Sequence, residues 1–386
     1  MSYFIYAIIV VVFLDTFIQL PIIAPLAVEL GAPPFLTGLI VGIYSLANMV
    51  GNALSGPWID KHGRKKVLLT GIAFVSITIM FYPFVNSGES LFFVRLLHGL
   101  AGGLLIPASF AYLGDRAPEQ KKGKTMALSG ACIGTSAIIG PALGGAIAST
   151  LSIQAVFYFV AGIFIVTGVT ASFILKESYT APCKDSQTVR KFDGVITLIK
   201  QPMLILAMIG AFSLMTSMGT LAYSLPLKID ALGLNPAITG MLLSSFGVVA
   251  LIIFLTPINK IFDRTDSLVL MIVGLCLISV SLISLSQFNH LIFIFIILAV
   301  YGIGFAFIFP SMNRLVLDAS TKKDRGKAFG LFYAAFSLGV VFGSVLSGAT
   351  AISVITPFLI NGVLLLFFTM IIYLLKRRID LRLKMS

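Results

Sequence analysis

Asp15 lies midway along an otherwise almost wholly apolar stretch, Ile5–Leu26. We place each of the other fourteen acidic residues in a loop or at a helix end. If the stretch crosses a membrane, a carboxylate at its middle costs about 2.5–3.5 kcal/mol on insertion scales. Such a residue commonly moves a proton, holds a cation or pairs with a buried base.

Two basic residues on a second apolar stretch are the candidate partners of Asp15. Arg95 lies in the outer third of that stretch, and His98 lies one helical turn further in. The axial gap between Asp15 and Arg95 is about 10 Å at the α-helical rise, so a long arginine side chain brings an ion pair or water bridge within reach. Burial and a nearby cation act on the pKa of a carboxyl group in opposite directions, which suits a proton-coupling site. The alternatives are a structural ion pair or a snorkelling carboxylate for Asp15, and a packing histidine for His98.

The composition indicates a polytopic membrane protein. Of 386 residues, 58% are hydrophobic and 11% are charged, whereas soluble chains average about 25% charged. The first apolar run has no basic leader and is long enough to span, so we expect a retained helix rather than a signal peptide. The net charge of +12 follows membrane topology and does not indicate nucleic-acid binding. No disulfide framework or metal site can be built from Cys132, Cys183 and Cys276.

The apolar runs predict an all-α integral membrane fold with twelve spans of about 20 residues each. The first six are expected at 4–28, 36–58, 67–85, 90–113, 124–149 and 153–175, and the second six at 203–227, 236–259, 267–286, 290–316, 326–350 and 352–376. Of the 27 Lys and Arg, 24 fall in the even-numbered connections and the C-terminal tail. The odd-numbered connections hold only Lys228, in the expected loop 228–235. The positive-inside rule therefore places both termini in the cytoplasm.

The two halves of the chain repeat one another. Leu30-Gly31 recurs as Leu232-Gly233 at an offset of 202, and from Asp60, which recurs as Asp263, the offset is 203. This predicts two pseudo-symmetric six-helix bundles, 1–175 and 203–386, joined by a cytoplasmic linker at 176–202. Two such halves enclose a cavity near the bilayer midplane, and rocking them gives alternating access. The counterparts of Asp15, Arg95 and His98 lie near Met218, Leu298 and Tyr301, so the first half alone carries the ionisable chemistry.

Three segments resemble motifs of the major facilitator superfamily, and the resemblance covers the full chain. Gly56-Pro-Trp-Ile-Asp60-Lys-His-Gly63-Arg64-Lys65-Lys66 resembles the family's loop between helices 2 and 3. Arg95 followed by Leu96-x-x-Gly99 resembles its helix-4 motif. Gly140-Pro141-Ala-Leu-Gly144-Gly145 resembles the helix-5 motif typical of antiporters, with Ser136 where a glycine is usual. The resemblance is strongest to twelve-span drug/metabolite–proton antiporters.

The loop motif suggests a cytoplasmic gate. Asp60 ends helix 2, and Gly63 permits the tight turn between spans. Arg64 can bind a carboxylate bidentately, and Asp115 at the cytoplasmic end of helix 4 is the candidate partner. The alternative is that these charges only set topology. In helix 5 the glycines form a small-residue face and Pro141 favours a bend, either for packing alone or for a hinge.

The sequence therefore favours a secondary transporter, most simply a proton-coupled exporter of small drug-like or metabolite molecules. The candidate cavity residues are Gln19, Tyr44, Asn48, His98, Tyr223, Tyr301 and Tyr333. Alternatives are an uptake symporter of the same fold for a sugar or organic acid, and, more remotely, a membrane-embedded enzyme or sensor, for which no catalytic motif is present. We expect no cofactor beyond the proton gradient, no metal and no nucleic acid. The partners are protons, the small-molecule substrate and the lipid bilayer, and the protein is expected to be a monomer in a bacterial plasma membrane.

Overall fold

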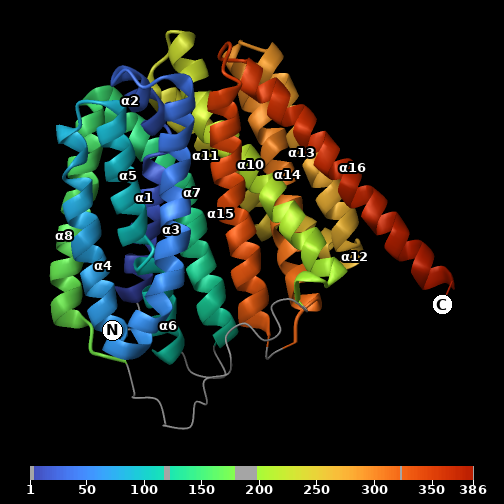
Figure 1. Ribbon diagram of the computed structural model, residues 1–386, viewed down its shortest axis with the longest axis horizontal. Helices are drawn as coiled ribbons and strands as arrows, with labels where there is room; N and C mark the ends of the chain where they lie inside the picture. Colours follow the sequence, from blue (N-terminus) through green and yellow to red (C-terminus); the bar gives the residue numbers. More distant parts are fainter. Residues whose placement is uncertain (1–3, 117–121, 179–197, 322–323, 386) are drawn as a thin grey trace. The chain divides into compact units, whose positions relative to one another are not determined.

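The computed structural model describes residues 4–116, 122–178, 198–321 and 324–385, and within these ranges the regular structure is entirely helical (Figure 1). Eleven described helices, counting α4 with η1 and α5 with α6 as one each, are long and apolar enough to cross a membrane. A twelfth span is reached if α1 and α2 are taken together. The structure thus agrees with a multi-pass helical membrane protein.

The helices follow the predicted apolar runs closely. The first half comprises α1 (Phe4–Ile18), α2 (Ile23–Glu29), α3 (Pro34–His62), α4 (Arg64–Ile79), η1 (Tyr82–Phe84), α5 (Gly88–Gly102), α6 (Leu105–Arg116), α7 (Lys122–Thr150) and α8 (Ile153–Ile174). The second half comprises α10 (Pro202–Ala231), α11 (Pro236–Leu255), η3 (Pro257–Lys260), α12 (Ile261–Arg264), α13 (Ser267–Gln287), α14 (Leu291–Asp318), α15 (Arg325–Ala349) and α16 (Thr356–Met385).

The first span is broken just after Asp15. α1 and α2 are bent by 44° across residues 19–22. Pro21 lacks the N–H that would continue the helix, and the neighbouring Leu20 and Ile22 N–H groups bond to the third residue before them, Phe17 and Gln19. The break places Gln19 beside Asp15, at the point where the chain changes direction.

The fourth predicted span is also interrupted. α5 begins with a Ser87 capping box and ends at Gly102. α6 resumes at Leu105, shortly before Pro107. Pro107 has no N–H to bond to the carbonyl of Gly103, which accounts for the interruption. Arg95 and His98 both lie on α5.

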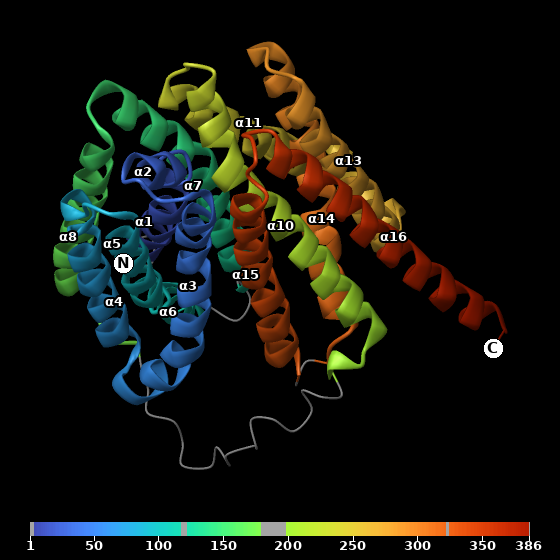
Figure 2. The same ribbon diagram turned by 45° about the horizontal axis from the view of Figure 1, so that its top comes forward.

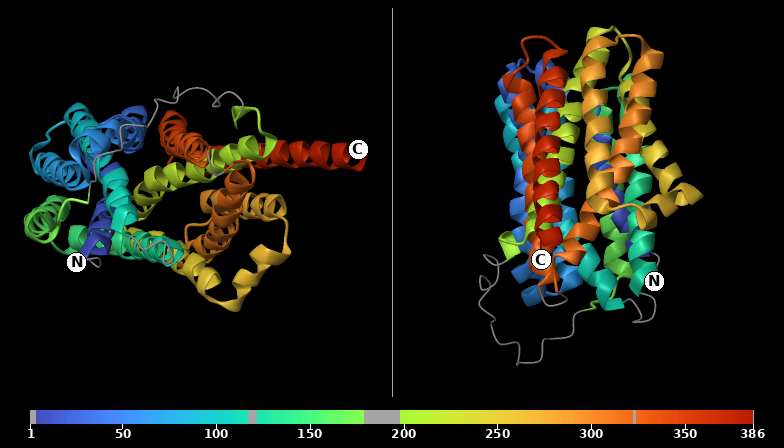
Figure 3. Two further views of the ribbon diagram at one scale, coloured as in Figure 1. Left: turned by 90° about the horizontal axis from the view of Figure 1, so that it is seen from below. Right: turned by 90° about the vertical axis from the view of Figure 1, so that its right-hand side faces the viewer.

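The chain divides into two compact units. Unit 1 contains residues 1–183 and 225–244, and unit 2 contains residues 184–224 and 245–386. In unit 1, α3 packs on α5, α1 on α7, and α4 on α8 (Figures 1 and 2). In unit 2, α13 packs on both α14 and α16, and α16 can be followed in red in Figure 3. Most of the expected linker, residues 179–197, lies outside the described residues, as does Cys183.

One pair of repeat-related turns has the same backbone conformation in the two halves, and a second pair does not. Gly31 and Gly233, which the offset of 202 relates, both have left-handed φ angles of 75° and 69°. Gly63 also has a positive φ of 90°, but its counterpart Asp266 has a φ of −56° and caps α13. A side chain is therefore tolerated at position 266 where the first half requires glycine.

Two expected boundaries are corrected. Lys228 was expected in a loop, but it lies inside α10 and is 2% exposed. α10 continues to Ala231 because no glycine or proline breaks it between Pro226 and Gly233. The last helix reaches Met385 and not 376, since the basic tail from Lys376 onward contains no glycine or proline to end it.

Candidate functional site: a buried polar network and a cytoplasmic charge cluster

Both carboxylate oxygens of Asp15 are engaged inside unit 1. Oδ2 lies 3.0 Å from Nε2 of His98, and Oδ1 accepts a 2.7 Å hydrogen bond from the side-chain amide of Gln19. Asp15 is 2% exposed and His98 is fully buried. A buried acid in contact with an imidazole is a group whose charge depends on both partners together.

Arg95 reaches Asp15 only through Gln19. Its Nη1 donates a 3.0 Å bond to Gln19 Oε1. Its Nε and Nη2 donate to the carbonyl oxygens of Ile40 and Val41 on α3, at 2.9 and 3.2 Å. The sequence suggested an ion pair or a water bridge between Asp15 and Arg95, and in the structure the bridging group is the side-chain amide of Gln19. The guanidinium is thereby fixed to α3 while its charge stays near the acid.

The second imidazole nitrogen of His98 contacts the turn between α4 and α5. Nδ1 lies 3.0 Å from the hydroxyl of Tyr82 in η1. The rings of Tyr44 and Tyr82 contact the imidazole edge-to-face at 5.1 and 5.6 Å. Tyr82 also stacks on Phe157 of α8 at 4.2 Å. His98 is therefore held by aromatic rings and has a polar partner at each nitrogen.

Small residues let the supporting helices approach. A Cβ on Gly99 of α5 would meet the backbone of Tyr44 on α3. A Cβ on Gly140 of α7 would lie 2.7 Å from that of Phe17, and one on Gly144 would meet the carbonyl of Ile18. Close packing of α7 on α1 thus positions the break that carries Gln19, and close packing of α5 on α3 positions His98.

A serine reinforces the contact between α1 and α7. Ser136 Oγ donates a 2.9 Å bond to the carbonyl of Val10 on α1. This is the position where the family motif usually has glycine, so the departure has a structural use. Pro141 lies within an unbroken α7, and Gly145 faces the backbone of Pro236 in the same unit.

Unit 2 contains an uncharged counterpart of the Asp15–His98 pair. Ser217 and Tyr301 share a 2.7 Å hydrogen bond, and both side chains are fully buried. Phe246 contacts Tyr301 edge-to-face at 5.4 Å, as Tyr44 contacts His98. The offset of 202 that relates Gly31 to Gly233 relates Asp15 to Ser217, the residue before the predicted Met218. The repeat therefore keeps the contact and removes the charge.

A second cluster lies at the predicted cytoplasmic end of unit 1. Arg64 Nε lies 3.0 Å from Asp115 Oδ2, and Nη1 lies 3.7 Å from Asp60 Oδ1. Nη1 also donates to the Ile59 carbonyl at the end of α3. The structure thus brings together the loop arginine and the two acids singled out in the sequence, and a gating role for them stays a prediction.

Sequence reasoning missed Glu177 at this cluster. Its Oε1 accepts bonds from the backbone N–H groups of Arg64 and Lys65, at 3.0 and 3.2 Å. It therefore caps the N-terminus of α4, where a carboxylate is favoured by the free N–H groups and the helix dipole. A Cβ on Gly63 would lie 2.7 Å from this carboxylate. The only sequence signal was an acid just beyond a helix end.

The corresponding end of unit 2 is arranged differently. Asp266 caps its own helix by accepting bonds from Leu268 and Val269 N–H. Asp318, the counterpart of Asp115, lies 4.0 Å from Arg314 one turn back on α14. Arg314 also donates from Nη1 to the Phe262 carbonyl of α12 at 3.0 Å. The contact between the loop and the helix end is therefore made in unit 2 by an arginine of the helix, and not by one of the loop as in unit 1.

The remaining candidate cavity residues differ in exposure. Tyr223, like Tyr44 and Tyr301, is buried, whereas Tyr333 is 52% exposed. Asn48 accepts a 2.9 Å bond from Asn52 within α3. No group of three or more metal-ligating His, Cys, Asp or Glu side chains gathers among the residues that the structure describes.

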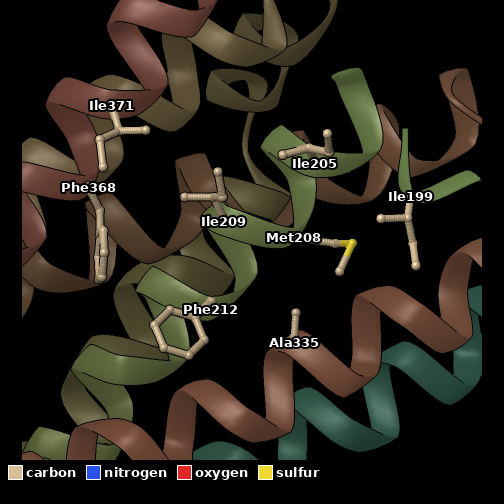
Figure 4. A pocket seen from close by; sticks show the side chains of 8 residues that line it. All are labelled: Ile199, Ile205, Met208, Ile209, Phe212, Ala335, Phe368 and Ile371. Carbon is tan, nitrogen blue, oxygen red and sulfur yellow. The ribbon is translucent and has the colours of Figure 1, made fainter. Parts of the chain in front are cut away.

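A cavity of about 540 Å³ lies in unit 2, on α10, α15 and α16, and contains none of the predicted cavity residues. Its lining is apolar, and Figure 4 labels Ile199, Ile205, Met208, Ile209, Phe212, Ala335, Phe368 and Ile371. Phenylalanine and methionine side chains line it, without an acidic group.

Comparison with known proteins agrees with this architecture. The chain is 25% identical over 339 residues to multidrug resistance protein 2 of Bacillus subtilis (strain 168), covering 84% of this chain and 82% of the relative. It is 23% identical over 318 residues to multidrug resistance protein MdtG of Escherichia coli O9:H4 (strain HS), covering 81% and 77%. Among solved structures, a bacterial homologue of the human lysosomal transporter Spinster, inward-facing and occupied, superposes with a TM-score of 0.81 at 13% identity, covering 97% and 96%.

The sequence model of the Major Facilitator Superfamily matches residues 5–319 and, separately, residues 207–384. The second match begins near the start of α10. With most of the chain matched, this protein belongs to the Major Facilitator Superfamily and is a membrane transporter, not an enzyme.

Proposed function

We propose that this transporter couples the export of small organic molecules to proton entry by alternating access. The observation that carries the proposal is the buried contact between Asp15 and His98, with Arg95 linked through Gln19. A carboxylate and an imidazole in contact inside a membrane span form a group that can gain and lose one proton. Its proton affinity changes when either side of the protein opens and water reaches it.

The asymmetry between the units supports the same proposal. Ser217 and Tyr301 occupy the repeat-related positions and carry no ionisable pair suited to neutral pH. If the fold needed only a polar contact between these two helices, a neutral pair such as Ser217 and Tyr301 would serve in unit 1 as well. The ionisable pair Asp15 and His98 in unit 1 therefore indicates a role beyond packing, and proton coupling is the simplest such role.

The relatives favour export of drug-like molecules over uptake. Those reported above carry the names of multidrug resistance proteins and match over most of their length. The aromatic rings beside Asp15 suit a lipophilic cation, which would take the place of the contacts that Asp15 makes with His98 and Gln19. The Arg64–Asp115 contact would then hold the cytoplasmic side closed and separate when it opens.

Transport by purified protein in lipid vesicles tests this function. Vesicles are energised with an imposed proton gradient and screened with lipophilic cations and metabolites. Gradient-driven movement is expected for wild type and is expected to be lost in Asp15→Asn. Ser217→Ala removes the repeat-related hydroxyl and serves as the matched control, which should keep transport. Coupled transport by Asp15→Asn equal to wild type would sink the proposed role of Asp15.

A further inference from the structure

His98 has a partner at each ring nitrogen and is fully buried. Nε2 faces Asp15 Oδ2 and Nδ1 faces the Tyr82 hydroxyl, both at 3.0 Å. Because a carboxylate only accepts, Nε2 must carry a hydrogen whenever Asp15 is ionised. Nδ1 can then either accept from the Tyr82 hydroxyl or, when protonated, donate to it.

We propose that His98 is a second proton-carrying residue of this site, and that it exchanges its proton through Tyr82 with the turn at the predicted outer end of α4. The inference rests on the proposed proton-coupled transport and adds to it a named carrier and route. Histidine is suited to the role because its proton exchange falls within the physiological pH range.

The geometry accommodates both protonation states. In the neutral state Tyr82 donates to Nδ1, and in the charged state Nδ1 donates to the Tyr82 oxygen. In each state Nε2–H donates to Asp15. One proton can therefore be added or removed by rotating a single hydroxyl, without breaking a contact of the pair.

The groups around the imidazole favour Asp15 as its counter-charge. They are Asp15 from α1, Tyr44 from α3, Tyr82 from η1 and Arg95 from α5 itself. Arg95 points to the carbonyls of α3 and to Gln19, and its guanidinium lies 5.0 Å from the centre of the Tyr44 ring. The opposite charge in direct contact with His98, among the described contacts, is thus that of Asp15.

Tyr82 connects this pair to the outer turn. It begins η1, between Phe81 and Pro83, and both Phe81 and Phe84 are exposed. In transfer, Tyr82 gives its hydroxyl proton to Nδ1 and takes one from a hydronium ion on the outer side, which leaves as water, so the phenol ends unchanged. Tyr82 is itself 1% exposed, so the exchange requires the outer side to open. The repeat-related residue in unit 2 is Leu285, which has no hydroxyl to extend the Ser217–Tyr301 pair.

Nitrogen-15 NMR of histidine-labelled protein in lipid nanodiscs tests the proton carrier without a substrate. The chain has three histidines, and His62 and His290 are exposed. Replacing those two with glutamine isolates the His98 signals and leaves the site intact. On lowering the pH over the range in which the protein stays folded, His98 is expected to change from one protonated nitrogen to two. Asp15→Asn is expected to displace that change along the pH axis.

A His98 that keeps one protonated nitrogen over the whole range would overturn the proposal. That result would leave the coupling role of Asp15 untouched, because vesicle transport by Asp15→Asn decides it separately. Conversely, uncoupled transport together with a titrating His98 would reject the proposed function while keeping the proton site.

The route is tested by Tyr82→Phe, which keeps the ring that stacks on Phe157. Exchange of the His98 proton, read from NMR line shapes, is expected to slow by about 10²-fold or more, as for the loss of a positioned proton donor. Tyr44→Phe is the matched control, because Tyr44 contacts the imidazole through its ring and its hydroxyl faces Thr16. Equal exchange rates in Tyr82→Phe and Tyr44→Phe would rule out the Tyr82 route.

Discussion

Gln19 stands between Asp15 and Arg95, donating to the first and accepting from the second. It does so from the four-residue break that separates α1 from α2. The acid and the guanidinium thus influence one another without forming a direct ion pair. A neutral amide keeps both satisfied, and each would otherwise be a buried polar group lacking one partner.

Gln19→Ala is expected to lower the stability of the protein. It leaves Asp15 Oδ1 and Arg95 Nη1 without their described partner, at about 1–3 kcal/mol for each unsatisfied group. Thermal unfolding in detergent measures the loss, with Leu20→Ala as a control one residue away on a half-buried side chain. A Gln19→Ala protein as stable as the Leu20→Ala control would show that the bridge contributes little.

The site was only partly predictable from sequence. The three ionisable residues were identified because charges are rare within apolar spans. Their pairing was not, because an axial distance along two helices says nothing about which side chains face each other. His98 lies one turn deeper than Arg95 and so is nearer in height to Asp15, and Pro21 breaks α1 where Gln19 can bridge to the arginine.

The fold was more predictable than the contacts between distant segments. Each span is set by a local run of apolar residues, so its approximate bounds follow from the sequence. Tyr82, Ser136 and Glu177 act through contacts with residues far along the chain, and no periodic pattern marks them. Lys228 was misplaced because one charge suggested a loop, although the helix around it is uninterrupted.

Arg64→Ala is expected to impair transport while the protein stays folded and inserted. The side chain links Asp115 on α6 with Asp60 and the end of α3, and alanine removes all of these contacts. The pair is partly exposed, so its effect on stability should stay within about 1 kcal/mol. Arg314→Ala, which removes the contacts of unit 2 with Asp318 and with the Phe262 carbonyl, is the matched control at the repeat-related end. Normal turnover of Arg64→Ala in vesicles would remove the gating role.

Glu177→Ala is expected to destabilise the start of α4. The carboxylate accepts from two backbone N–H groups, and loss of a helix cap costs about 0.5–2 kcal/mol. Hydrogen exchange at Arg64 and Lys65 should accelerate, as should exchange in the segment that carries Glu177. Asp266→Ala removes the equivalent cap of α13 but should affect only its own helix, because that cap is local. Equal, purely local effects in the two variants would contradict the link between α4 and residues 175–178.

Gly63→Ala is expected to cost more stability than Gly31→Ala. Both glycines have a positive φ, which costs an alanine about 1 kcal/mol or more. A Cβ at position 31 meets no atom within 4 Å, whereas one at position 63 meets the Glu177 carboxylate. Thermal unfolding of both variants separates backbone strain from crowding. The double variant Gly63→Ala with Glu177→Ala should lose less stability than the sum of the two single variants, and strict additivity would place the cost of Gly63→Ala in the backbone alone.

Gly144→Ala is expected to weaken the packing that positions Asp15, whereas Gly134→Ala is not. Both residues lie in α7, but a Cβ at position 144 would meet the carbonyl of Ile18 and one at position 134 meets no atom within 4 Å. Overpacking at position 144 should cost about 1–3 kcal/mol. At position 134 the better helix propensity of alanine should leave stability unchanged or raised by up to about 1 kcal/mol. Because Ile18 precedes Gln19, the Gly144 variant should also alter the Asp15 site, and NMR of His98 reports this directly. A Gly144→Ala protein with wild-type stability and unchanged His98 signals would mean that α1 can shift away from α7 without moving Asp15.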